Sequence, residues 1–222
     1  ALPGLPAFVF LNPQSAARKA FLPSVWRRFH FHGVGMIFRS PIKFCRACGT
    51  AVVYRIPDDG DTRERAVCPH CHTIHYENPL NVVGTIPVTD DGRVLLCKRN
   101  IEPRRGLWTL PAGFMELAET TARGAQRETD EEAGADIEMG PLFSIVDVPK
   151  VTQVHLFYRA RLRSEQFYPG PETMEARLFA EAEIPWEELA FRTVRVTLER
   201  YFEDRAAGLL DAHRVHSIDL SL

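Results

Sequence analysis

Three glutamates on one predicted helix are the residues whose type and spacing most directly suggest chemistry. Residues 119–133 (ETTARGAQRETDEEA) predict a helix that ends at Gly134, because glycine favours the left-handed conformation that terminates helices. At about 100° per residue, Glu128, Glu131 and Glu132 fall within an arc of roughly 100°. Clustered carboxylates repel one another, and several oxygens at one place suit Mg2+ or Mn2+. The sequence therefore predicts a divalent-metal site on a cleft-facing helix.

A solvated glutamate face is the ordinary alternative, and the setting of the cluster argues against it. The lysine partners that a surface helix normally carries are absent, and Arg127 stands directly beside the glutamates. The preceding loop, LPAGF, contains Gly113, whose backbone carbonyl could serve as another metal ligand. A separate stripe of small side chains would let the helix pack closely on a sheet: Ala122, Ala125, Thr129 and Ala133.

Two C-x-x-C pairs form a second chemical cluster. Cys45 and Cys48 are followed, after an interval of 19 residues, by Cys68 and Cys71. Two tight turns brought together offer four thiolates in a tetrahedron, which Zn2+ prefers, and a closed four-sulfur shell makes the metal structural. We predict an all-β zinc ribbon over residues 43–79; four unliganded thiols are the alternative. Nearby histidines are expected at the surface or around the ligands: His70, His72 and His75.

The elements that must position the glutamates follow from the patterning of residues 80–206. NVVGTIPV and VLLCKRN flank an Asp-Gly turn and predict a hairpin in which Cys97 is a buried small side chain. Three further strands are expected after the glutamate helix: 141–149, 153–163 and 176–184. Apolar residues at near-helical spacing predict a packing helix over 185–206, and 207–222 are expected to be a C-terminal tail.

Composition bounds the class of protein. The chain has 222 residues, 45% hydrophobic and 25% charged, which is typical of a soluble globular protein. No apolar run approaches the roughly 18 residues that a membrane helix needs. A net charge of −2 argues against binding nucleic acid by charge alone. Five cysteines, four of them paired for a metal, fit a reducing compartment, so we expect a cytoplasmic and bacterial protein.

Residues 1–35 differ from the rest of the chain. They contain no Asp or Glu and little periodicity, and a coherent pattern begins only after Met36. We expect a disordered or artefactual extension without a role in the domain. Organellar targeting by this acid-poor segment and a partner-binding arm are the two alternatives.

Residues 113–135 carry a family resemblance. They match the Nudix box, G-x5-E-x7-R-E-U-x-E-E-x-G-U, at every fixed position, and depart from it at Thr129 and Ala135, where larger aliphatic residues are preferred. With the cysteine unit ahead of the box, the chain resembles a zinc-ribbon branch of the Nudix hydrolases. Stretches such as PGPETMEARLFA also resemble plant chloroplast FAD pyrophosphohydrolases. The resemblance covers about residues 43–206.

The resemblance implies an α/β/α sandwich with a mixed sheet that hydrolyses a nucleoside diphosphate linked to another moiety. Carried over by position, the metal ligands would be Gly113, Glu128, Glu131 and Glu132, with Mg2+ or Mn2+ as the cation. Glu128 is also a candidate general base, and Arg127 would orient the carboxylates. Glu119 would brace the loop and helix. Relatives pair, which makes a homodimer plausible.

A later loop, PGPETMEAR, could complete the catalytic shell through Glu172 or Glu175, with a structural ion pair as the alternative. Trp108 could stack on a base or flavin, or belong to the core. Phosphate oxygens suit a guanidinium fork, and the candidates for that contact are Arg99, Arg104 and Arg105.

The substrate is expected to be FAD or ADP-ribose, with AMP as one product. Pro149 follows the box at about the distance seen in ADP-ribose-cleaving relatives. The S-Q-P-W-P-F-P motif of the zinc-bearing NADH pyrophosphatases is absent, which weakens the alternative of NADH or NAD-capped RNA. A non-catalytic nucleotide sensor whose ribbon and basic arm bind nucleic acid is the alternative from another class.

Overall fold

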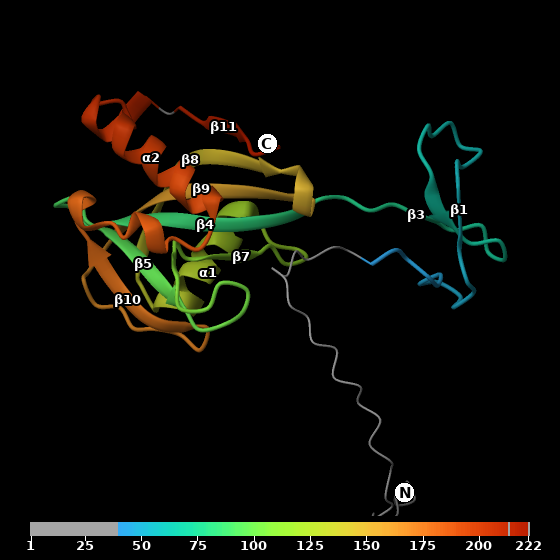
Figure 1. Ribbon diagram of the computed structural model, residues 1–222, viewed down its shortest axis with the longest axis horizontal. Helices are drawn as coiled ribbons and strands as arrows, with labels where there is room; N and C mark the ends of the chain where they lie inside the picture. Colours follow the sequence, from blue (N-terminus) through green and yellow to red (C-terminus); the bar gives the residue numbers. More distant parts are fainter. Residues whose placement is uncertain (1–39, 213, 222) are drawn as a thin grey trace, which may run out of the picture. The chain divides into compact units, whose positions relative to one another are not determined.

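The computed structural model describes residues 40–212 and 214–221. Within this part of the chain, a cysteine-bearing unit and a larger α/β domain each have their own sheet and are described separately (Figure 1). The predictions made for residues 1–35 lie outside the described residues. No helix in the described ranges is long and apolar enough to cross a membrane.

The cysteine-bearing unit is a small antiparallel sheet, as predicted for a ribbon. Its strands are β1 (Val53–Arg55), β2 (Arg65–Val67) and β3 (Ile74–His75), in the order β1-β2-β3. Each C-x-x-C pair sits on a tight turn, because Gly49 N donates to Cys45 O and His72 N donates to Cys68 O, at 2.8 and 3.0 Å. The two turns present their cysteines from separate parts of the chain.

The larger domain is built on a mixed sheet with the strand order β10-β5-β4-β9-β8-β11, to which β6 and β7 add at β5 and β4. The β4–β9 and β8–β11 pairs are parallel, and the other neighbours are antiparallel. The strands are β4 (Leu80–Val88), β5 (Val94–Arg99), β6 (Trp108–Thr109), β7 (Ala112–Phe114), β8 (Ile137–Val148), β9 (Gln153–Leu162), β10 (Thr173–Phe179) and β11 (His216–Asp219). The predicted hairpin is confirmed as β4 and β5.

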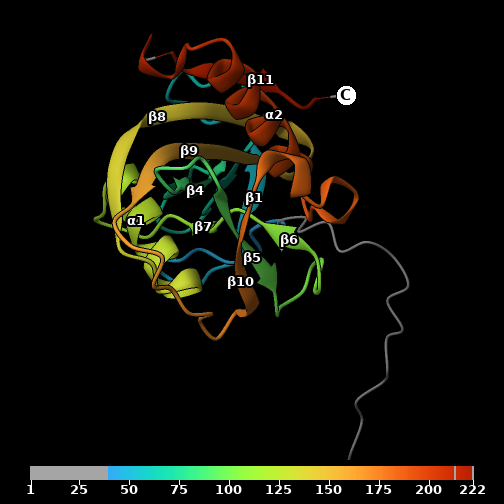
Figure 2. The ribbon, with the colours of Figure 1, turned by 90° about the vertical axis from the view of Figure 1, so that its left-hand side faces the viewer.

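Two helices cover opposite faces of this sheet, α1 (Thr121–Ala133) and α2 (Arg192–Ala206) (Figure 2). On β4, Thr85 bonds Thr129 of α1 through their hydroxyls at 2.7 Å. The next residue, Ile86, faces the other way into the core cluster that contains Leu198 of α2, as the alternation of a strand requires. The expected α/β/α sandwich is confirmed.

The glutamate helix begins and ends as its sequence indicates. Thr120 caps the N-terminus by accepting a hydrogen bond from Arg123 N, and Gly134 ends the helix at φ +54°. The stripe of small residues faces the sheet, since Ala125, Thr129 and Ala133 are fully buried. Small side chains there let the helix lie close to β4, and the glutamates occupy another face.

The second helix starts later than the predicted 185–206. Residues 186–188 form a 3₁₀ turn, and Ala190 N donates to Trp108 O at 2.7 Å before α2 begins at Arg192. Pairing with Trp108 keeps the chain extended at Leu189, although the apolar residues of 185–206 repeat at helical spacing. Short 3₁₀ turns also occur at Pro149–Val151, Glu181–Glu183 and Leu210–Ala212.

The predicted C-terminal tail contains a strand. His216–Asp219 form β11, which runs parallel to β8 and pairs with Ser144 through Asp147. His216 Nε2 lies 2.8 Å from Asp204 Oδ2 of α2, which fixes the strand to the rest of the domain. The prediction missed this element because an isolated four-residue strand has no pattern of its own.

Candidate active site and zinc site

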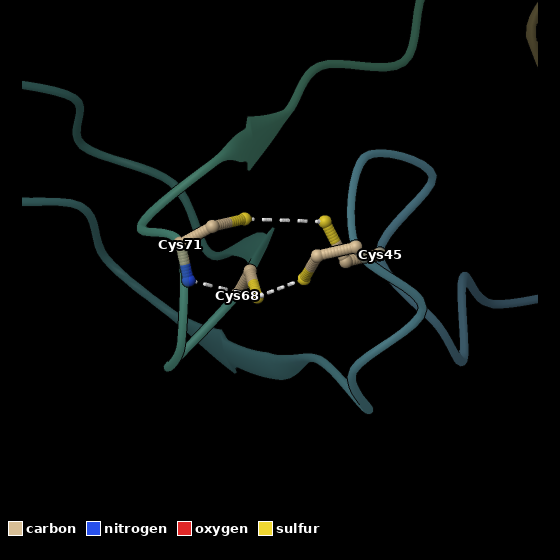
Figure 3. A group of neighbouring side chains, drawn as sticks. Cys45, Cys68 and Cys71 are labelled. Atoms are coloured by element: carbon tan, nitrogen blue, oxygen red, sulfur yellow. Dashed lines mark hydrogen bonds between the residues drawn. The ribbon is translucent and has the colours of Figure 1, made fainter.

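The four cysteines of the ribbon converge on one point. Figure 3 labels three of them, Cys45, Cys68 and Cys71. Their sulfur atoms all lie within 4.8 Å of one another, with Cys45 to Cys71 at 3.6 Å and Cys48 to Cys68 at 3.5 Å. A tetrahedron with Zn–S bonds of about 2.3 Å separates its sulfurs by roughly 3.8 Å. The donor set and its spacing therefore fit a structural zinc ion.

The histidines near the cysteines take the places expected of them. His70 and His72 are exposed, whereas His75 is buried and accepts a 3.3 Å hydrogen bond from Arg46 Nε at Nδ1. The zinc ligand set needs no histidine, because the four sulfurs already supply it.

Arg127 is the hub of the glutamate cluster. Its Nε and Nη2 donate to the two carboxylate oxygens of Glu119 at 3.1 and 2.9 Å, and its Nη1 donates to Glu128 at 2.7 Å and Glu131 at 3.0 Å. Nη2 also donates to Phe114 O at 3.2 Å. The guanidinium lowers the pKa of Glu119, and the carboxylates raise the pKa of Arg127. The Arg127 guanidinium thus ties the loop before α1 to three carboxylates.

Glu128 and Glu132 are buried with too little positive charge around them. Glu128 is 9% exposed and Glu132 is 8% exposed. Burial raises the pKa of Glu128, and it raises the pKa of Glu132 to about 8, although Glu132 Oε2 accepts a hydrogen bond from Ala112 N at 3.0 Å. A divalent cation among these oxygens would supply the missing charge. The residues present therefore fit such a cation.

Gly113 is required by the position of Glu128. A Cβ atom at this residue would lie 2.3 Å from Glu128 Oε2, so no other amino acid leaves the carboxylate where it is. Glu128 and Glu131 are at present held by Arg127, and among the described residues only the four cysteines already stand at metal-ligand spacing. Arg127 bonds one oxygen of each of these carboxylates, so the second oxygen of each is available to a cation.

A loop that follows β9 brings Glu172 to the same place. Tyr168 N and Gly170 N donate to Ala133 O and Glu132 O at 2.8 and 3.1 Å, which satisfies carbonyls at the end of α1. Asn100 N donates to Glu172 O at 2.8 Å on the other side. The two attachments hold Glu172 at the rim of the cavity that contains the box glutamates.

This cavity has a volume of about 880 Å³. Its acidic part is lined by Glu128, Glu131, Glu132 and Glu172, together with Gly113. Two of the predicted phosphate-contacting residues line it as well: Arg99 and Arg104. Carboxylates and guanidinium groups thus share one solvent-accessible space, as an anionic substrate with bound cations requires.

Other predicted contacts lie elsewhere. Arg105 does not line the cavity, and its Nη2 donates to Asn100 Oδ1 at 3.2 Å. Trp108 is only 4% exposed and packs edge-on against Phe179 at 4.9 Å, so it belongs to the core rather than to a stacking surface. Glu175 is exposed on β10, opposite Lys98 of β5.

Comparisons with known proteins agree with the two-part organisation. Residues 43–77 match the family model described as Nudix N-terminal, a zinc ribbon, and residues 79–200 match the NUDIX domain. The crystal structure of a NUDIX hydrolase from Nitrosomonas europaea superposes with a TM-score of 0.74 and 50% identity, covering 80% of this chain and 99% of that one. An ADP-ribose pyrophosphatase from Streptococcus suis, at 22% identity and a TM-score of 0.50, covers 64% of this chain and 99% of its own and shares the fold.

Among curated proteins, the NAD-capped RNA hydrolase NudC of Photobacterium profundum is 27% identical over 173 residues, which cover 76% of this chain and 59% of that protein. NudC of Stutzerimonas stutzeri is 28% identical over 165 residues, covering 73% and 57%. The chain thus spans less than two thirds of the length of these relatives. With the box glutamates, the mixed sheet and the domain match in agreement, the chain belongs to the NUDIX domain family and carries the Nudix zinc ribbon ahead of that domain.

Proposed function

We propose that this chain is a metal-dependent pyrophosphohydrolase that cleaves the diphosphate bridge of a nucleoside diphosphate linked to a second moiety. The observation that carries the proposal is one cavity whose lining brings five glutamates, among them the three box glutamates and Glu172, together with four arginines, among them Arg99 and Arg104. The carboxylates suit hard divalent cations, and the guanidinium groups suit the phosphate oxygens of the substrate. The cavity volume of about 880 Å³ lies in the range of small-molecule sites.

The roles follow from the contacts of each side chain. Glu128, Glu131 and Glu132 would hold Mg2+ or Mn2+, which when bound neutralises phosphate charge and activates water. Arg127 would keep the carboxylates in place through its hydrogen bonds. Glu172 faces the same cavity from another loop. Either Glu128 or Glu172 would accept the proton of the attacking water.

Glu119 and Gly134 would act on the framework rather than on the substrate. Glu119 accepts hydrogen bonds from Arg127 and from Glu116 N, the latter at 2.7 Å. It therefore joins the loop to the helix. Gly134 ends α1 directly after the glutamates. Arg99 and Arg104 would contact the diphosphate.

Adenine dinucleotides are the substrates that we favour. The sequence resemblance points to FAD or ADP-ribose, and relatives named for NAD-capped RNA support NADH or NAD-capped RNA at least as well. All of these molecules contain an AMP moiety joined through a diphosphate, so the same carboxylates and arginines would serve each of them. A cytoplasmic location and a homodimer are further proposals, in keeping with bacterial relatives and reduced thiols.

A substrate panel tests the proposal. Purified protein with Mg2+ or Mn2+ is incubated with FAD, ADP-ribose, NADH and NAD-capped RNA, and the products are identified by mass spectrometry. We expect at least one member to be cleaved at the diphosphate, with AMP or a 5′-monophosphate end as product. No turnover of any member with metal present would contradict the proposal, and retention of RNA without hydrolysis would favour the nucleic-acid-binding regulator.

The metal assignment has its own test. The double variant Glu131→Gln, Glu132→Gln keeps the shape of both side chains and removes two ligand charges. We expect turnover to fall by about a thousandfold or more, because removing metal ligands removes the stabilisation of phosphate charge. The circular dichroism spectrum should stay that of the wild type. Turnover equal to that of the wild type would remove these residues from the metal site.

A further inference from the structure

The cavity extends beyond the glutamates onto the sheet face that α2 covers. His155 of β9 lies two residues before Phe157, a core residue beneath α2, so both side chains point to that face. Val82 of β4 is the register neighbour of His155. The apolar residues that line this part of the cavity are Val82, Val148, Val151, Phe191 and Leu220.

The C-terminal strand contributes one of these walls. Leu220 follows β11 directly, and its backbone N–H donates to Asp147 O of β8 at 2.9 Å. Its side chain is 7% exposed and lines the cavity. Leu220, just after β11, therefore helps to close a compartment whose other walls come from β4, β8, β9 and the start of α2.

A polar pair lies in this mainly apolar compartment. His155 Nε2 and Gln153 Oε1 are 3.0 Å apart, and both residues line the cavity. Burial lowers the pKa of His155 to about 4, so the imidazole is neutral at neutral pH. With Gln153 Oε1 as the acceptor, the ring proton is on Nε2. Nδ1 then presents an acceptor and the Gln153 amide presents donors.

Neither group of this pair makes another side-chain hydrogen bond among the described residues. A neutral acceptor beside a neutral donor does not match a phosphate, which needs the cations found elsewhere in the cavity. It matches the edge of a planar heterocycle that carries a donor next to an acceptor. The apolar walls suit the faces of such a ring.

We propose that His155 and Gln153 are specificity-determining residues that recognise the edge of a neutral heterocycle of the substrate, in a compartment closed by Leu220. The inference rests on the proposed pyrophosphohydrolase function and adds to it the part of the cavity that selects the ring. Two rings of a dinucleotide carry this edge chemistry. One is adenine. The other is the ring of the second moiety, either the flavin or the nicotinamide, which offers its carboxamide group.

Steady-state kinetics of His155→Phe and Gln153→Leu test the inference. Both substitutions keep the approximate size of the side chain and remove its hydrogen-bonding groups. We expect KM to rise about tenfold or more while kcat stays within about threefold, because the lost contact is equally strong in ground and transition states. Tyr158→Phe is the control, since Tyr158 lies on the opposite face of β9 and bonds Thr121 of α1.

The choice of substrate identifies the ring. Adenine is the only planar nitrogen heterocycle of ADP-ribose, whereas FAD and NADH each have a second one. A higher KM for every substrate that the wild type cleaves shows that adenine is recognised. A higher KM for FAD and NADH but not for ADP-ribose shows that the second ring is recognised. Unchanged KM values throughout, or a lower kcat with unchanged KM, would overturn the inference.

A spectroscopic measurement separates failure of this inference from failure of the proposed function. Long-range ¹H–¹⁵N spectra report the Nδ1 shift of His155 while adenosine, riboflavin or nicotinamide is added to wild-type protein without divalent cations. A new hydrogen bond at Nδ1 changes that shift, even if the chain hydrolyses nothing. We expect a saturable change with at least one ring and the same change in Tyr158→Phe. No change with any of the three would refute the role of the pair.

Discussion

At the scale of single residues, the protonation of Glu132 links the site to stability. Its pKa is about 8 in the folded protein because the carboxylate is buried. In the unfolded chain the pKa is about 4.3. Because the folded pKa is the higher one, the metal-free protein binds more protons than the unfolded chain between these values. The contribution of Glu132 to the free energy of unfolding is then complete below about pH 4.3 and is lost as the pH rises through 8.

Glu132→Gln removes this titration and gives a first prediction. Without added Mg2+ or Mn2+, we expect the variant to unfold at a higher temperature than the wild type at pH 9, and the gain to shrink toward pH 5. The upper bound of the effect is about 5 kcal/mol, at about 1.4 kcal/mol per pKa unit. Scanning calorimetry at both pH values measures it. A difference that does not depend on pH would show that Glu132 is not the buried titrating group.

At the scale of elements, the loop between β9 and β10 depends on a close approach to α1. A Cβ atom on Gly170 would lie 1.7 Å from Glu131 O, which is backbone and cannot move aside. Gly170→Ala should therefore displace the loop that carries Glu172. We expect kcat to fall about tenfold or more, and the free energy of unfolding to fall by about 1–3 kcal/mol.

Gln166→Ala is the matched control for that substitution, because Gln166 is exposed in the same loop. Its kcat and unfolding temperature should equal those of the wild type. Kinetics and thermal unfolding measure both variants. Wild-type kcat in Gly170→Ala would mean that the position of this loop, and of Glu172, does not matter for turnover.

The elements also show what the sequence was able to predict. The spacing of Glu128, Glu131 and Glu132 is local, so helical periodicity alone brings them to one face. The core position of Trp108 depends on Phe179, which is 71 residues further along the chain. Leu220 lines the cavity only because β8 has an edge free to pair with β11. Such long-range pairings leave no periodic signal in the sequence.

At the scale of the whole molecule, the two parts of the chain are stabilised by different means. The two hydrophobic core clusters contain only residues of the larger domain. In the ribbon, the buried apolar or sulfur-bearing side chains of the described residues are Cys45, Pro57, Ala66, Val67 and Cys68. Burial of so few side chains cannot offset the conformational entropy that about 35 residues lose on folding. The folding free energy of the ribbon must therefore come from its metal.

Removing two zinc ligands should therefore unfold one part and spare the other. We expect the double variant Cys48→Ser, Cys71→Ser to lose its zinc, whereas the intact chain should hold one zinc ion. The backbone amide hydrogens of residues 43–77 should lose their protection against exchange with solvent, while those of the strands and helices from β4 onward keep it. Cys97→Ser is the matched control, because Cys97 is a buried thiol outside the ligand set and its loss should leave zinc content unchanged. Protection that persists in the ribbon of the zinc-free variant would show that its few buried side chains suffice, and that the four sulfurs are not what holds this part together.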